Sequence, residues 1–219
     1  MEEYYRVSYW SGFCLLFAII LGGCSSTYYG AMEKVGIHKR DILVDRVEGA
    51  RDSQMDAQEQ FKTALEQFNS VVTLKETDLK KAYDRLNREY EDCRDAAALV
   101  SEKIRKVESV SEDLFDEWSD ELRLYENKDL ARASKKQLLT TQSQYREMIG
   151  RMHRAENSMD PVLKLFRDNV LFLKHNLNAQ AIGSLQGEFA NLESQIDNLI
   201  ARMSEAIESS NAFIAGMKE

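Results

Sequence analysis

The chain has 219 residues, of which 43% are hydrophobic and 30% charged, and its formal net charge is −8. A net acidic charge argues against nucleic acid as a direct partner, because phosphate binding needs a basic face. The sequence holds one proline, where average usage would give about ten, and this argues against a β-sandwich, a barrel or a disordered tail. Three cysteines are too few for the disulfide framework of a small secreted domain.

The first 23 residues are predicted to be a signal peptide. Residues 13–21 form an unbroken run of nine apolar residues. This run is shorter than the ~20 residues that a bilayer-spanning helix needs, and its length is typical of the apolar core of a secretory signal. The run ends in the tetrapeptide Leu-Gly-Gly-Cys at residues 21–24. This tetrapeptide resembles a bacterial lipobox, in which the cysteine, here Cys24, is lipidated and becomes the mature N-terminus.

We therefore expect a lipoprotein on the periplasmic face of the outer membrane, with residues 24–40 as a lipidated tether. Burial of an acyl chain contributes about 0.8 kcal/mol per methylene, so several chains on one cysteine hold firmly. Ser25 after the cysteine resembles the pattern of lipoproteins sorted to the outer membrane. Glu2 and Glu3 make the start of the signal less basic than usual, so an uncleaved anchor, inner-membrane anchoring, secretion and cytoplasmic residence stay as alternatives.

A short basic segment follows the tether cysteine. It contains Lys34, His38, Lys39 and Arg40, and basic groups beside an anionic leaflet are attracted to it. We therefore predict membrane contact at these four residues. The alternative is pairing with residues 108–121, which hold seven acidic and no basic side chains and which a simple up-down topology would bring close.

From about residue 41 onward the sequence predicts one all-α domain, 41–219, built as an elongated antiparallel four-helix bundle with short loops. Apolar residues recur at spacings of four and three, the pattern of coiled-coil-like helices, and short breaks make neighbouring helices antiparallel. The predicted helices are 41–72, 78–125, 129–175 and 179–217. The first apolar stripe is Leu43, Val47, Ala50, Gln54, Ala57, Phe61, Ala64, Phe68 and Val71.

Local signals refine this prediction. Asp78 or Thr77 is suited to cap the second helix and Asn178 the fourth. Pro161 falls inside the third helix and should kink it, or restart it with Ser158 or Asp160 as a cap.

Charge adds a prediction about the order of the helices. The third helix carries nine Lys/Arg against five Asp/Glu, whereas the other three are acidic. We expect it to lie between two acidic neighbours, because its field then offsets their mutual repulsion.

The sequence offers no catalytic constellation. Its histidines are His38, His153 and His175, and none lies in the Glu-x-x-His pattern of a di-iron bundle. The sequence has no Cys-x-x-Cys or His-Glu-x-x-His zinc motif, no phosphate-binding loop and no Gly-x-Ser-x-Gly elbow. We therefore expect no enzyme activity, no metal and no cofactor.

Several single residues carry predictions of their own. His175, Asn176 and Asn178 lie in the connection before the fourth helix, at the bundle end predicted to be farthest from the membrane. They are candidates for a partner-binding tip, although polar residues in such a loop mostly serve to form the turn.

Two further predictions concern packing. Trp118 and Cys93 follow the stripe of the second helix and are predicted to be buried, with a partner-binding anchor as the alternative for Trp118. Gly183 and Gly187 share one helical face and are predicted to allow close helix approach.

Residues 28–47, 170–179 and 212–217 resemble an uncharacterised bacterial family, a domain of unknown function. Its members look like secreted or lipid-anchored helical proteins of Gram-negative bacteria. The resemblance spans nearly all of the mature chain and implies one full-length domain in the cell envelope. It carries over no catalytic residue.

The expected function is that of a non-catalytic envelope scaffold, spacer or protein-binding adaptor. Its predicted partners are the membrane, through the lipid anchor, and an envelope protein; pairing with a second copy is compatible with the long stripes. The alternative is a bundle that binds a lipid or hydrophobic peptide between its helices. Met148, Met152 and Met159 would then line a slot, because thioether side chains adapt to varied shapes.

Overall fold

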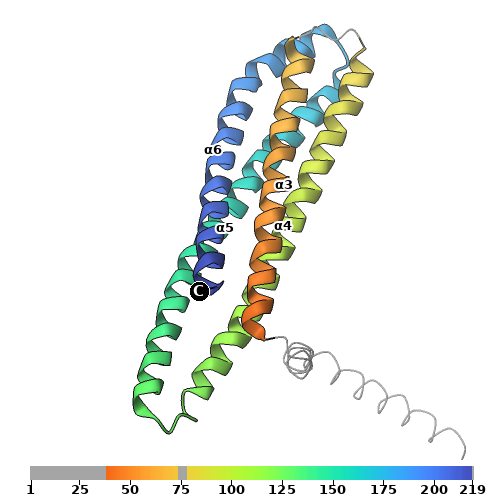
Figure 1. The fold of residues 1–219 in the computed structure, drawn as a ribbon. Helices are drawn as coiled ribbons and strands as arrows, with labels where there is room; N and C mark the ends of the chain where they lie inside the picture. Colours follow the sequence, from red (N-terminus) through yellow and green to blue (C-terminus); the bar gives the residue numbers. More distant parts are fainter. Residues whose placement is uncertain (1–37, 74–77, 219) are drawn as a thin grey trace, which may run out of the picture.

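The computed structural model describes residues 38–73 and 78–218, and these residues form four long helices. The helices are α3 (Lys39–Thr73), α4 (Leu79–Glu121), α5 (Lys128–His175) and α6 (Ala179–Lys218). They run antiparallel in chain order, and each helix packs mainly against two neighbours (Figure 1). The predicted all-α antiparallel bundle is confirmed. The basic helix α5 packs against the acidic helices α4 and α6, as its charge predicts.

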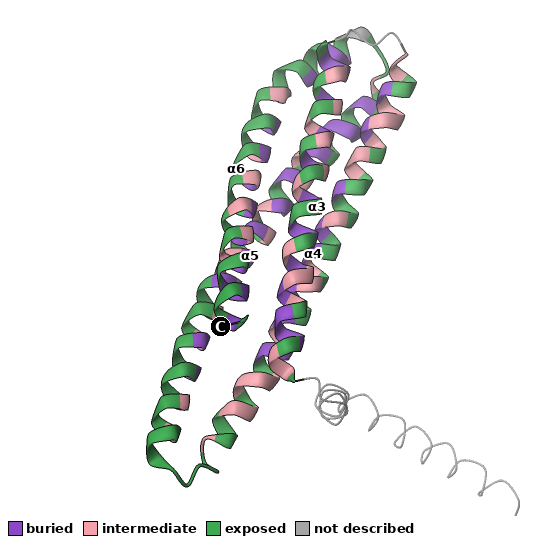
Figure 2. Ribbon diagram, in the orientation of Figure 1, coloured by how far each residue is buried: buried purple, intermediate pink, exposed green. Residues whose placement is uncertain are grey.

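The core lies along the bundle axis, on the inner faces of the helices (Figure 2). Every member of the predicted first stripe is buried in α3. An aromatic cluster packs in the core, with Phe166 edge-on against Phe68 and Tyr90 at centroid distances of 6.1 Å. Phe68 also stacks on Phe189 of α6. Burial of these rings, with the aliphatic core around them, stabilises the fold.

The helices α4 and α5 extend past the other two. They contain 43 and 48 residues, against 35 in α3 and 40 in α6. At 1.5 Å per residue, α5 is about 70 Å long. The hairpin that joins α4 to α5 projects beyond the start of α3 and the end of α6 (Figure 1), and its surface is mostly exposed or half-buried (Figure 2).

The structure corrects two predictions about the second helix, the burial of Trp118 and the helix end at residue 125. Trp118 is half-buried, and its Nε1–H donates a hydrogen bond to Ser134 Oγ at 2.9 Å across the hairpin. Tyr125 is 43% exposed and lies beyond Glu121, where α4 ends. Trp118 lies level with the first turn of α3, beside Lys39 and Arg40, and Tyr125 lies beyond the end of α4, so the repeat continues to where the core ends.

Pro161 does not restart the third helix, which is continuous from Lys128 to His175. The Ser158 hydroxyl donates to the Ala155 carbonyl at 2.7 Å, and Asp160 pairs with Lys164, so neither predicted cap forms. Proline removes the hydrogen bond to the carbonyl four residues earlier. Because Asn157 and Pro161 are both exposed, water can satisfy that carbonyl.

The predicted caps at Asp78 and Asn178 are confirmed. Asp78 Oδ1 accepts from the Lys81 N–H at 3.1 Å, and Asn178 Oδ1 accepts from the Ala181 N–H at 3.0 Å. The close-approach role of the two glycines in α6 is wrong, because a Cβ added at Gly183 or Gly187 would meet no atom within 4 Å. Both glycines lie on the exposed face of the helix.

One polar side chain in the core has no hydrogen-bond partner among the described residues. Gln54 is fully buried in α3, and neither its Nε2 nor its Oε1 has a hydrogen-bond partner among the described residues. An unpaired buried amide costs about 1–3 kcal/mol. We therefore expect Gln54→Leu to raise the free energy of unfolding by about 1–3 kcal/mol, measured by urea denaturation followed by circular dichroism.

Gln58, one helical turn later, is the matched control. Its Nε2 donates to the Ile200 carbonyl at 3.0 Å and to Ser204 Oγ at 2.9 Å, which links α3 to α6. Gln58→Leu removes these bonds and should give no such gain in stability. If Gln54→Leu instead lowers the free energy of unfolding, the Gln54 amide has a partner in solution.

Candidate functional site

The basic segment enters the bundle at the lower end in Figure 1, which we call the proximal end. Lys39 Nζ lies 3.0 Å from Glu117 Oε2, and the Lys39 side chain is only 12% exposed. Arg40 Nε donates to the Met217 carbonyl at 2.9 Å. The expected proximity of the basic segment to residues 108–121 is therefore confirmed. These contacts join the first turn of α3 to both neighbouring helices.

The same contacts change how the predicted membrane site is interpreted. Lys39 and Arg40 belong to the first turn of α3, two residues before the predicted start of the bundle at 41. His38 precedes the helix and is exposed, whereas Lys34 and the lipobox Cys24 lie outside the described residues. Membrane contact at these positions stays a prediction.

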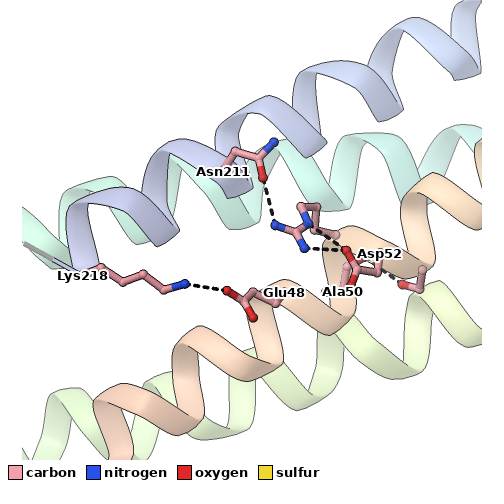
Figure 3. Close-up of polar contacts among 7 residues, drawn as sticks. Glu48, Ala50, Asp52, Asn211 and Lys218 are labelled. Carbon is pink, nitrogen blue, oxygen red and sulfur yellow. Dashed lines mark hydrogen bonds and ion pairs between the residues drawn. The ribbon is translucent and has the colours of Figure 1, made fainter.

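The seam between α3 and α6 is held by polar contacts (Figure 3). Lys218 Nζ lies 2.9 Å from Glu48 Oε1, and Arg51 Nη1 donates to Asn211 Oδ1 at 3.1 Å (Figure 3). Exposed pairs of this kind contribute under about 1 kcal/mol each. Their effect is to fix where the C-terminal end of α6 lies along α3.

His153 lies between two carboxylates on the α4–α5 seam. Its Nε2 is 2.8 Å from Glu108 Oε1 and its Nδ1 is 2.8 Å from Glu156 Oε2. Partial burial acts to lower the pKa of His153, but the hydrogen bonds to Glu156 and Glu108 outweigh it, so the pKa of this imidazole is raised above 6.5. The protonated ring donates to both carboxylates at once.

This clamp predicts a pH-dependent stability. A histidine with a raised folded-state pKa stabilises fully below its unfolded-state pKa, and the stabilisation is lost as the pH rises through the folded-state pKa. We expect the free energy of unfolding to fall by up to about 1 kcal/mol between pH 5.5 and 8.5, because the side chain is 39% exposed and solvent screens it. Urea denaturation at the two pH values measures the change.

The matched variant for this prediction is His153→Gln. It keeps a hydrogen-bonding side chain on the seam but cannot titrate, so the stability difference between wild type and variant should shrink as the pH rises. A difference that is constant across this pH range would show that the clamp does not carry a charge.

Cys93 is buried in α4 as predicted, and its Sγ lies 3.8 Å from the Gln60 carbonyl. Burial, with added repulsion from Glu89 and Asp92, raises the pKa of this thiol to about 12. A thiol held protonated is a poor nucleophile, so Cys93 is chemically inert in the folded chain.

The opposite end, which we call the distal end, holds the predicted partner-binding residues. His175 is the last residue of α5 and is exposed. Asn176 Nδ2 donates to the Phe172 carbonyl at 2.8 Å, and Asn178 caps α6. The two asparagine side chains therefore form the turn, whereas partner binding at the exposed His175 stays a prediction.

The distal end also exposes apolar side chains that the sequence reading missed. Leu171, Phe172 and Leu177 are 45%, 40% and 49% exposed. A groove of about 400 Å³ between α5 and α6 continues from Phe172. Its lining residues are Leu165, Asp168, Asn169, Phe172, Ser184, Leu185 and Glu188. The signal was available, because Leu171 and Phe172 lie off the buried stripe of their helix.

Metal sites and membrane-spanning helices are the two other features to consider in the described residues. Across 38–73 and 78–218, no group of three or more His, Cys, Asp or Glu side chains is arranged to hold a metal ion. No helix within these ranges is both long and apolar enough to cross a membrane.

Comparison with known proteins gives one match. A family described as "Protein of unknown function (DUF2959)" matches residues 28–217. No curated protein and no solved structure matches the chain.

Proposed function

Because the chain belongs to this family of proteins of unknown function, whose description assigns no activity, we propose a role from the geometry of the bundle. The protein is a non-catalytic, lipid-anchored adaptor on the periplasmic face of the outer membrane. The anchor at Cys24 holds the proximal end at the membrane, and the distal end meets an envelope protein. The bundle between them is a spacer of about 70 Å along α5.

The observation that supports this role is the contrast between the core and the distal end. The interior is filled by tightly buried apolar side chains, which suits a rigid rod. At the distal end, by contrast, the apolar side chains of Leu171, Phe172 and Leu177 are exposed, at positions where a polar side chain would fit equally well. Exposed apolar side chains next to a groove mark a protein-contact site. They lie at the end opposite the entry of the chain from Cys24 (Figure 1).

In-cell photo-crosslinking tests the adaptor role. A photoreactive amino acid is placed at Leu177 on the distal end or, as the matched control, at Met55 on the side of α3. Both positions are 49% exposed, so they differ in location and not in accessibility. We expect a discrete adduct with an envelope protein at 177 and none at 55.

Two results would count against the role. Equal crosslinking at 177 and 55 would show that the distal end has no special affinity. An adduct at 177 with twice the mass of the chain would assign the distal end to pairing between two copies, and not to an adaptor function.

The alternative function, binding of a lipid or hydrophobic peptide between the helices, requires the core to open. Met148, Met152 and Met159 are at most 2% exposed and belong to the continuous core. A ligand between the helices would have to displace them. Native mass spectrometry of the purified chain tests this alternative, since a bound lipid would add its mass.

A further inference from the structure

The hairpin between α4 and α5 exposes a second apolar cluster, at the proximal end. We define the proximal tip as residues 122–140. Leu124 is 79% exposed, Leu130 57% and Tyr125 43%. Leu139, 55% exposed, follows on α5 beside a groove of about 590 Å³ that Arg132, Lys135 and Lys136 also line. Apart from the buried Leu138 and the half-buried Leu122, Ala131 and Ser134, the residues of this tip are exposed.

The proximal tip is basic in an acidic chain. Residues 122–140 hold five basic side chains, Arg123, Lys128, Arg132, Lys135 and Lys136, and two acidic ones, Glu126 and Asp129, giving +3 against −8 for the whole chain. Arg123 pairs with Asp120, and Arg132 with Asp129. The three lysines form no ion pair within the described residues 38–73 and 78–218. Their charge is therefore available to an external anion.

The position of the proximal tip relative to the tether is fixed by one contact. The Lys39–Glu117 pair holds the start of α3 one helical turn before the end of α4. The chain from Cys24 to Lys39 has 15 residues, which can span at most about 50 Å. A membrane that holds Cys24 is thus within reach of Leu124 and Tyr125, whereas the distal end, about 50 Å away along the 35 residues of α3, would require a fully extended tether.

We infer that the proximal tip is a second membrane-contact site, which places Leu124, Tyr125 and Leu130 in the headgroup region of an anionic bilayer. Lys128, Lys135 and Lys136 meet the lipid phosphates. Exposed apolar side chains with lysines in the same segment are typical of interfacial membrane binding. The inference rests on the proposed lipid anchor, and it assigns the membrane contact to the hairpin in place of Lys39 and Arg40, whose side chains are engaged within the bundle.

A second copy of the chain fits the proximal tip less well than lipid does. Two tips of charge +3 would repel each other in a symmetric dimer, whereas an anionic surface neutralises each of them. A lipid surface also explains why the apolar residues lie at the extreme end of the hairpin. A side-by-side partner would be expected to cover the flanks instead.

Site-specific fluorescence tests the inference on the full chain. The chain is produced in a Gram-negative host, purified from membranes and reconstituted into phosphatidylethanolamine–phosphatidylglycerol vesicles that contain a nitroxide-labelled phospholipid. An environment-sensitive maleimide dye is attached to L124C or, as the matched control, to L177C at the distal end. Both positions are exposed, and the buried Cys93 thiol does not compete for the dye.

We expect the dye at position 124 to be quenched about twofold or more and blue-shifted, consistent with a depth of about 5–10 Å. The dye at 177 should be unchanged. Quenching at 124 should fall when phosphatidylcholine replaces phosphatidylglycerol, and also in the triple variant K128Q/K135Q/K136Q.

The failures are distinguishable. If the chain floats with the vesicles but the dye at 124 is not quenched, the contact at the proximal tip is overturned and the anchor is retained. If the dye at 124 responds to protein density and not to the lipid quencher, a second copy covers the tip and the inference is likewise overturned. A chain that does not float with the vesicles overturns both the anchor and this inference.

Discussion

Replacing Phe166 with alanine is expected to lower the free energy of unfolding by about 3–5 kcal/mol, the range for a large buried aromatic side chain. The Phe166 ring is fully buried and packs edge-on against Phe68 of α3 and Tyr90 of α4. Its removal leaves a cavity where three helices meet and breaks two aromatic pairs, each worth about 0.5–1.5 kcal/mol beyond its area. Urea denaturation followed by circular dichroism measures the loss.

Phe172→Ala is the control for this variant. Phe172 lies on the same helix six residues later but is 40% exposed, so its removal should cost under about 1 kcal/mol. Equal effects at 166 and 172 would contradict the packing described for the core. The helix content of each purified variant is measured by circular dichroism before denaturation. A lower stability is then distinguished from a failure to express or fold.

Replacing Cys24 with serine is expected to move the chain from the membrane fraction to the soluble periplasmic or secreted fraction. The thioether-linked acyl chains would be lost, and each buried methylene contributes about 0.8 kcal/mol, so no remaining contact compensates for them. The proximal tip adds only a weak interfacial contact. Fractionation of cells, with the chain detected in each fraction, measures the change.

Cys93→Ser is the matched control for the anchor. It also replaces one thiol by a hydroxyl, but at a buried position in α4, so it can lower stability without altering the membrane fraction. A Cys24→Ser chain that stays in the membrane fraction, and that still incorporates labelled fatty acid, would contradict lipidation at this position.

The fold was predictable because its information is local and repeated. The spacing of Phe61, Ala64, Phe68 and Val71 gives one buried face for each turn of helix, and the structure buries all four. Asp78 and Asn178 mark helix starts because their side chains accept hydrogen bonds from free backbone N–H groups. Charge then placed the basic helix α5 between acidic neighbours.

The sequence does not show over what length each apolar stripe is covered by a neighbouring helix. Trp118 continues the repeat of α4 but lies level with the first turn of α3 and is only half-buried, and Tyr125 lies beyond the end of α4. Gln54 likewise fits the stripe, although its amide is unpaired in the core. A repeat reports which face is apolar, and only the relative offset of the helices decides whether that face is buried.

The candidate sites were predicted less well than the fold. The polar residues chosen at the distal end, Asn176 and Asn178, have local roles in the turn. The exposed apolar residues Leu177 and Leu124 lie outside the buried stripes, which indicates exposure but does not indicate whether a partner or a membrane covers them. Two contacts at the proximal end, Lys39–Glu117 and Arg40–Met217, join residues that are distant in sequence.

The intact mass of the chain recovered from membranes tests the central claim, a lipid-anchored helical rod, most directly. The account predicts a chain that begins at Cys24, has lost residues 1–23 and carries the added mass of its acyl groups. A mass that includes residues 1–23, or a chain that begins at Cys24 with no added mass, would contradict it.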